Sequence, residues 1–146
     1  MKKHIPKYVS ANYMEKLINP KELAKQVDLA VWALMIMNKE FDSIAFRSMS
    51  GALLAPPVAA ILGKSLIMVR KEENSHSSHK VEGDIFAKTY IIVDDFTSSG
   101  KTARTIVEEI KIFAPQAKCL GLLAVDKLRE KFIKDAHLET WWMTIK

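Results

Sequence analysis

Two adjacent carboxylates, Asp94 and Asp95, stand between an apolar run and a turn rich in hydroxyl groups. The run at 90–93 is apolar and largely β-branched, which is typical of a buried parallel strand. The turn at 97–100 leads into a predicted helix over 101–114, so free backbone N–H groups, hydroxyls and the positive end of the helix dipole meet at a site suited to phosphate. Carboxylates repel phosphate, and we therefore expect them to face sugar hydroxyls or a hydrated Mg²⁺ on the same ligand. A sugar phosphate satisfies both halves of the motif.

Two other interpretations apply to the same residues. The end of the turn matches the end of a nucleotide-binding P-loop, G-x-x-x-x-G-K-[ST]. The first glycine of that motif would fall on Asp95, whose carboxylate would then lie against the nucleotide phosphates. A polar strand-to-helix turn without a ligand is the second alternative, but a buried strand that ends in two acids needs a reason to hold them together.

Four hydrophobic residues, two acids and a Thr/Ser-rich turn with glycine resemble the signature for phosphoribosyl pyrophosphate (PRPP) in type I phosphoribosyltransferases. In that family the acids bind the ribose hydroxyls of PRPP, which the resemblance assigns here to Asp94 and Asp95. The residues that it assigns to the 5′-phosphate are Thr97, Ser98, Ser99, Gly100, Lys101 and Thr102. Lys101 departs from the family, where many members have a small residue at this position.

A second unit of strand, small-residue turn and helix precedes the signature. A strand is predicted over 42–47, and a helix over 52–62 that tolerates Pro56 and Pro57 only near its first turns. The resemblance implies that the turn between them binds the pyrophosphate of PRPP. The residues that match this pattern are Arg47, Ser48, Ser50 and Gly51.

The next predicted strand, 65–69, ends in Arg70 and Lys71. The resemblance directs both cations at the pyrophosphate, whereas a merely solvated strand end is the alternative.

The polar segment 72–83 has too few apolar residues to stay ordered by itself, and segments of this kind are often lids. The resemblance implies a flexible loop that closes over the substrates, with His76, His79 and Lys80 as the candidates to contact pyrophosphate. Metal binding by His76 and His79 is the competing hypothesis. Residues 84–88 are predicted to re-enter the sheet.

The C-terminal part of the chain is predicted to complete the sheet and to contact the base. An apolar strand is expected over 118–125, followed by Lys127, which corresponds to a base-contacting lysine in purine-specific members or is simply exposed. Trp141 and Trp142 lie on opposite faces of a predicted last strand, 137–145, where they stack on the base or pack inward.

Composition bounds the remaining possibilities. A chain of 146 residues suits one domain, 1–146, and a net charge of +5 favours anionic ligands but is too modest to indicate nucleic acid. The single cysteine, Cys119, excludes a disulfide framework and favours a reducing compartment. We expect no signal peptide, no membrane span and a cytoplasmic location, because the longest apolar run, 29–37, is too short for a bilayer.

That run belongs to a helix predicted over 20–39 with Asn19 as its N-cap. Its apolar face widens there to nearly the whole circumference. We therefore expect it to be sandwiched in the core or shared with a partner subunit of a homodimer.

The pattern of alternating strands and helices predicts an α/β fold with a doubly wound, mostly parallel sheet flanked by helices. The family adds a small hood, here about 1–18 and 128–146, and a Mg-dependent pentosyltransferase activity. PRPP would transfer its ribose 5-phosphate to a nucleobase and release pyrophosphate, with Mg²⁺ held mainly by PRPP and with the two acids as candidate ligands. The residues given catalytic roles are Asp94, Asp95, Arg70, Lys71 and Lys80.

The preferred base is a purine in nucleotide salvage, although the sequence Val69–Glu72 also resembles orotate enzymes. Two further alternatives remain: a non-catalytic regulator that senses PRPP or binds RNA, and a P-loop-like nucleotide-binding protein.

Overall fold

The computed structural model describes residues 14–71, 79–94 and 101–125. In these ranges the elements are α1 (Glu15–Ile18), α2 (Pro20–Met37), β1 (Ser43–Phe46), α3 (Met49–Leu62), β2 (Ser65–Val69), β3 (Val81–Gly83), β4 (Thr89–Asp94), α4 (Lys101–Phe113) and β5 (Lys118–Ala124).

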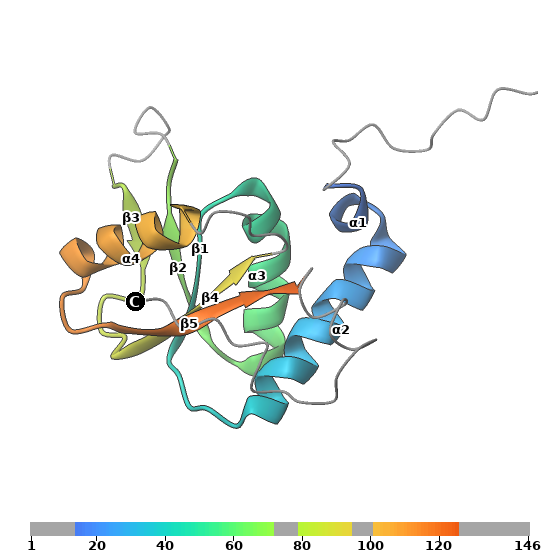
Figure 1. Cartoon of the computed structure of the whole chain (residues 1–146), viewed down its shortest axis with the longest axis horizontal. Helices are drawn as coiled ribbons and strands as arrows, with labels where there is room; N and C mark the ends of the chain where they lie inside the picture. The colour runs from blue at the N-terminus through green and yellow to red at the C-terminus, as the bar shows by residue number, and fades with distance from the viewer. Residues whose placement is uncertain (1–13, 72–78, 95–100, 126–146) are drawn as a thin grey trace, which may run out of the picture.

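The five strands form one sheet in the order β3-β2-β1-β4-β5, with helices on both of its sides (Figure 1). β1, β2, β4 and β5 are parallel, and β3 pairs antiparallel with β2 at one edge. All four residues of the central strand β1 are buried, as a strand covered on both faces requires. The predicted doubly wound, mostly parallel sheet is confirmed.

Alternate residues of β4 show how the two faces are covered. Ile91 and Val93 pack into the core formed with α1, α2 and α3, whereas Tyr90 and Ile92 pack into the core formed with α4. The last residue of the strand, Asp94, is the first polar side chain after this buried run and is half-buried. The sheet therefore fixes the position of this carboxylate at the carboxyl end of β4 and the direction in which it points.

α2 begins as predicted, with the Asn19 side chain accepting hydrogen bonds from the backbone N–H groups of Lys21 and Glu22 at 3.0 and 3.4 Å. The expectation that this helix is sandwiched around 29–37 is wrong. Trp32 is 45% exposed and Met35 is 65% exposed, so the helix buries one face against the sheet and α3 and leaves the other outside.

α3 begins three residues before its predicted start, at Met49 rather than residue 52. Ser48 is its N-cap, so the expected turn forms the first turn of the helix. The prediction that Pro56 and Pro57 stand near the helix start is also wrong, because both lie well inside it. A proline removes one helical hydrogen bond, but the apolar inner face of α3, whose Leu54 and Val58 are fully buried, keeps the helix in place.

The third strand lies earlier than predicted. β3 covers residues 81–83, whereas residues 84–88 contain a turn and no strand, which corrects the expected re-entry there. Gly83 allows the backbone of β3 to lie close to that of β2. Its φ is 141°, and a Cβ at this position would lie 2.1 Å from the carbonyl oxygen of Leu66. Part of the predicted 72–83 loop is therefore ordered strand, and residues 72–78 lie outside the described residues.

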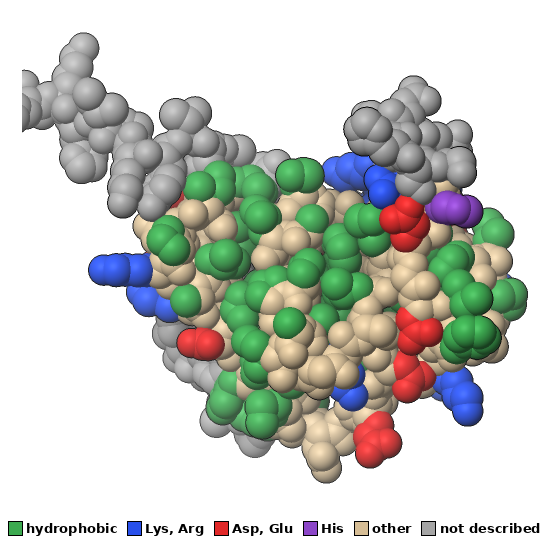
Figure 2. All heavy atoms as spheres, turned by 180° about the vertical axis from the view of Figure 1, so that it is seen from behind, with side chains coloured by type: hydrophobic (Ala, Val, Ile, Leu, Met, Phe, Trp, Pro, Cys, Tyr) green, Lys and Arg blue, Asp and Glu red, His purple; other side chains and the backbone are tan. Residues whose placement is uncertain are grey.

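The outer surface of α3 carries no charged side chain, since none occurs between Met49 and Leu62. Met49 is 71% exposed and Ile61 is 60% exposed. Figure 2 shows hydrophobic side chains gathered over the half of the molecule that carries α2 and α3. In the part of the chain that the structure describes, no helix has the length and hydropathy to cross a bilayer.

Candidate active site

The polar residues singled out in the sequence meet at the carboxyl ends of the parallel strands. β1 and β4 are neighbours, and the chain leaves β1 toward β2 on one side while β4 lies on the other. Ligands of open α/β sheets bind at such a reversal of strand order, in the crevice outside the carboxyl ends. Asp94 ends β4 at this crevice, and Ser48 caps the helix that follows β1.

Hydrogen bonds join the turn after β1 directly to Asp94. Its Oδ1 accepts from the hydroxyl of Ser50 at 3.1 Å and from that of Ser48 at 3.4 Å. The two hydroxyl oxygens lie 2.8 Å apart, and Ser48 Oγ also accepts from the backbone N–H of Gly51 at 3.0 Å. The carboxylate is thus held in one orientation by residues from a different strand-helix unit.

Gly51 permits this close contact between the turn and β4. A Cβ at this position would lie 3.1 Å from Phe46 Cβ and 3.3 Å from Ser48 Oγ. Both distances are tighter than ordinary van der Waals contact, so a larger residue would push the turn away from Asp94.

A pocket of about 420 Å³ opens beside this network. Its lining combines apolar side chains from β1, α3 and β2 with three cations, and consists of Phe46, Arg47, Ser48, Met49, Ala52, Met68, Val69, Arg70 and Lys71. The cations come from the ends of two adjacent strands, and several positive charges around one hollow favour a multiply charged anion. The pocket is therefore suited to a diphosphate.

Two acids that the sequence analysis missed organise the cations at this edge. Arg70 Nη2 lies 3.1 Å from Glu82 Oε2 in an ion pair whose side chains are 25% and 34% exposed. Lys80 Nζ lies 2.9 Å from Glu109 Oε1 on α4. The backbone N–H of Arg70 donates to the carbonyl of Lys80 at 2.8 Å, so the start of β3 is fastened to the end of β2.

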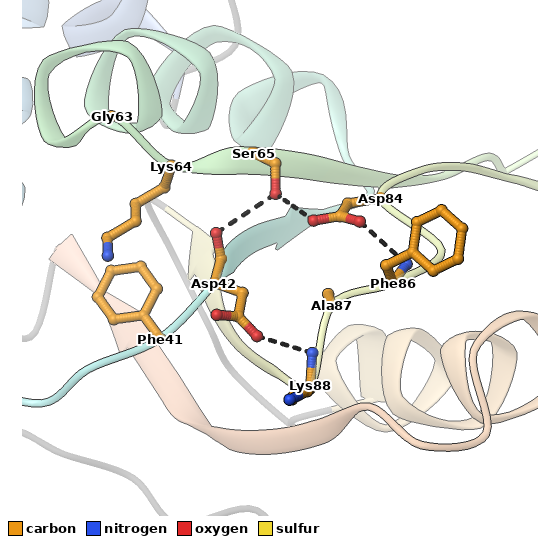
Figure 3. A pocket seen from close by; sticks show the side chains of 9 residues that line it. All are labelled: Phe41, Asp42, Gly63, Lys64, Ser65, Asp84, Phe86, Ala87 and Lys88. Atoms are coloured by element: carbon orange, nitrogen blue, oxygen red, sulfur yellow. Dashed lines mark hydrogen bonds between the residues drawn. The ribbon is translucent and has the colours of Figure 1, made fainter.

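A second pocket, of about 550 Å³, lies at the opposite end of the strands, beside the amino ends of β1, β2 and β4 (Figure 3). Its carboxylates are engaged by the protein. Asp42 accepts from the backbone N–H groups of Lys88 and Thr89, which lower its pKa from the usual value. Asp84 accepts from the Ser65 hydroxyl at 2.9 Å. These bonds fasten strand ends together, and we assign them a structural role.

Comparison with known proteins places this architecture in a family. No protein-family model matches the chain. An adenine phosphoribosyltransferase of Bifidobacterium longum (strain DJO10A) is 33% identical over 116 residues, which cover 68% of this chain and 60% of the relative. A second, from B. longum subsp. infantis, is 30% identical over 143 residues, covering 82% of this chain and 74% of the relative. This chain is a type I phosphoribosyltransferase family member.

The fold agrees with that membership. The crystal structure of the orotate phosphoribosyltransferase of Francisella tularensis superimposes with a TM-score of 0.60 at 18% identity, covering 73% of this chain and 52% of that one. The chain spans about 60% of the length of the first curated relative that it matches.

The structure brings together six of the residues that the phosphoribosyltransferase resemblance assigned to pyrophosphate, namely Arg47, Ser48, Ser50, Gly51, Arg70 and Lys71. Arg47, Ser48, Arg70 and Lys71 line the same pocket, whereas Ser50 and Gly51 are not part of its lining and contact Asp94 or Ser48. These positions fit the assigned roles, which remain predictions.

The other predicted residues are placed differently or lie outside the described ranges. Lys80 points to α4 rather than into the pocket, and His79 is described but does not line the pocket. Lys101 and Thr102 form the first turn of α4, as predicted. The predicted site residues outside the described ranges are His76, Asp95, Thr97, Ser98, Ser99, Gly100, Lys127, Trp141 and Trp142.

Proposed function

We propose that this protein transfers the ribose 5-phosphate of PRPP to a nucleobase and releases pyrophosphate. The observation that carries the proposal is the bonding of Asp94 to Ser48 and Ser50, beside a pocket with three cations. This arrangement offers a carboxylate for ribose hydroxyls and positive charge for the diphosphate of the same ligand. The alternative of a P-loop nucleotide site has no support from the family.

The chemistry needs charge stabilisation rather than a covalent nucleophile. A nitrogen of the base forms a bond to the anomeric carbon while the bond from that carbon to the pyrophosphate oxygen breaks. Negative charge builds on the leaving pyrophosphate, which Arg47, Arg70 and Lys71 would stabilise. Asp94 would bind a ribose hydroxyl and orient the anomeric carbon. Burial raises the pKa of the Cys119 thiol, which suits a structural role for this residue.

Mg²⁺ fits the residues present. This ion prefers carboxylate and phosphate oxygens and keeps several of its waters. Asp94 supplies a carboxylate at the crevice, the sequence places Asp95 next to it, and the phosphates of PRPP would supply further oxygens. When bound, Mg²⁺ would neutralise part of the charge on the pyrophosphate.

A purine is the preferred acceptor, in cytoplasmic salvage of free bases. Two relatives at 33% and 30% identity are adenine phosphoribosyltransferases, which supports a purine, and a relative at 26% identity over 99 residues is an orotate phosphoribosyltransferase, which keeps orotate as the alternative. Lys127, Trp141 and Trp142 remain the proposed base contacts.

Pyrophosphate release tests both the activity and the base. The protein with PRPP and Mg²⁺ is incubated with adenine, guanine, hypoxanthine or orotate, and pyrophosphate is measured for each. We expect release with a purine at a rate at least tenfold above that with orotate. Faster release with orotate would reverse the base assignment, whereas PRPP binding without release for any base would favour the non-catalytic regulator.

We also propose that two copies of the chain pair through the outer face of α3. A face without charge suits a second copy of itself, because a two-fold axis brings the same patch together from both subunits and this patch brings no like charges to the contact. The protein has a net charge of +5, which makes such an uncharged face the more favourable one for self-association. Met49 belongs both to this face and to the pocket lining, so pairing would border the pocket.

The oligomeric state provides the test of that pairing. Ile61→Glu introduces a charge into the proposed contact, near the end of α3, and we expect sedimentation analysis to show a dimer for the unmodified chain and a monomer for the variant. Ile112→Glu is the matched control, because Ile112 is 79% exposed on α4 in the opposite layer and should leave the dimer intact. If the unmodified chain is still a monomer at a concentration of about 100 µM, a dimer with a micromolar Kd is excluded.

A further inference from the structure

The ion pair between Lys80 and Glu109 joins two parts of the chain that flank the proposed PRPP site. Lys80 immediately precedes β3, and Glu109 lies on α4, whose first residue follows the proposed phosphate turn. The Nζ–Oε1 distance is 2.9 Å, and the side chains are 45% and 20% exposed. The pair is therefore in contact with solvent and is not locked in the core.

The backbone of Lys80 lies beside the pocket although its ammonium does not. The Lys80 carbonyl accepts from the backbone N–H of Arg70, a pocket residue, and Val81 pairs with Val69 in the adjacent step of the ladder. Lysine carries its charge on a flexible four-carbon stem, so the ammonium can change position without moving this backbone. The position of the Lys80 ammonium therefore depends on which anion binds its Nζ.

The neighbouring pair shows that an acid need not remove a cation from the pocket. Arg70 lines the pocket while its guanidinium pairs with Glu82. Glu109 has the opposite effect, because it lies on the helix that packs against the other face of the sheet and draws Lys80 toward that face. Glu82 therefore leaves Arg70 in the pocket, whereas Glu109 holds the Lys80 ammonium outside it, although the backbones of the two cations are hydrogen-bonded to each other.

We propose that Glu109 competes with the pyrophosphate group of PRPP for the Lys80 ammonium and thereby lowers the affinity for PRPP. This inference rests on the proposed function and adds to it the contact with pyrophosphate that the family resemblance implies for Lys80. Glu109 is then a positioning residue that never touches substrate. Its carboxylate must release Lys80 before the lysine contributes to binding.

The expected effect follows from the strength of a solvent-exposed ion pair. Such a pair is weak, and breaking it in advance should tighten PRPP binding about threefold. Glu109→Gln keeps the length of the side chain and removes its charge. Glu108→Gln is the matched control, because it removes the same charge from the adjacent, exposed position of α4.

The experiment measures the Kd of PRPP with Mg²⁺ by calorimetry, without a nucleobase, so that no turnover occurs. We expect the Kd to fall about threefold in Glu109→Gln and to stay within about 1.5-fold in Glu108→Gln. In a Lys80→Met background, which binds PRPP more weakly, Glu109→Gln should have no further effect. That loss of effect identifies the coupling between the two residues, as in a double-mutant cycle.

The possible results separate this inference from the proposed function. Unchanged or weaker binding in Glu109→Gln, while the unmodified protein binds PRPP, overturns the inference and leaves the function standing. Equal tightening by both glutamine variants reduces the effect to general charge and also overturns it. An unmodified protein that does not bind PRPP overturns the proposed function and the inference together.

Discussion

Replacement of Asp94 and Asp95 by asparagine is expected to abolish base-dependent release of pyrophosphate from PRPP and to leave the fold intact. The two carboxylates are the groups proposed to bind the ribose hydroxyls, and asparagine offers a neutral amide in place of a charged acceptor. A hydrogen bond to a charged group contributes about 1.5–3 kcal/mol. Loss of two such bonds at the reacting sugar, about 3–6 kcal/mol together, corresponds to a rate about 100- to 10,000-fold lower, and the upper end of this range is below detection in an ordinary assay.

Asp94→Asn alone should reduce kcat/KM for PRPP about 100-fold. The amide oxygen of asparagine can still accept from the Ser48 and Ser50 hydroxyls, so the turn after β1 keeps its contact with β4. Thermal unfolding should therefore be nearly unchanged while initial rates at varied PRPP fall.

Asp28→Asn is the control for the loss of one negative charge, because Asp28 is exposed on α2. Turnover in the double variant equal to that of the unmodified protein would remove the acids from the site. Loss of the thermal transition in the double variant would instead show that the carboxylates support the fold.

The buried strands could be predicted from the sequence because their signal is local. The predicted bounds of β1, β2, β4 and β5 agree with the structure to within one residue at each end. A strand covered by helices on both faces is recognised from its own apolar residues alone. The start of α2 was equally readable, since Asn19 and Pro20 act on the adjacent backbone groups.

β3 could not be predicted because its evidence lies on another strand. It has only three residues, and its position depends on the contact of Gly83 with the Leu66 backbone, 17 residues away in the chain (83 − 66). The proline pair in α3 failed for a similar reason. Local propensity disfavours Pro56 and Pro57 inside a helix, but the burial of its inner face against the sheet outweighs that preference.

The pocket residues were predicted from the family resemblance, and their grouping agrees with it. Arg47 and Arg70 are 23 positions apart (70 − 47) but follow adjacent parallel strands, so the sheet brings them to one hollow. The acidic partners of Arg70 and Lys80, Glu82 and Glu109, were missed. Nothing in the sequence links Lys80 with Glu109, because that ion pair exists only through the packing of α4 against the sheet.

Arg70→Gln is expected to lower kcat/KM for PRPP about 100-fold, the usual effect of removing one preorganised donor from a developing negative charge. Glutamine leaves the backbone bond to Lys80 in place. It also leaves Glu82 partly in water, since that side chain is 34% exposed, so the stability should fall by less than about 1 kcal/mol.

Arg70→Lys separates charge from geometry at the same position. Lysine restores a point charge but not the planar fork with which arginine can donate to Glu82 and to a phosphate together. We therefore expect recovery of only part of the lost rate, about tenfold below the unmodified protein. Arg104→Gln, an exposed position on α4, removes the same charge away from the pocket and should leave the rate unchanged.

Steady-state kinetics with varied PRPP, together with thermal unfolding, decide between these outcomes. Equal loss of rate in Arg70→Gln and Arg104→Gln would mean that the enzyme responds only to its net charge. A normal rate in Arg70→Gln would mean that the pyrophosphate binds elsewhere. The selective loss that we expect would place the leaving group in the pocket between β1 and β2, where the guanidinium already lies before any ligand binds.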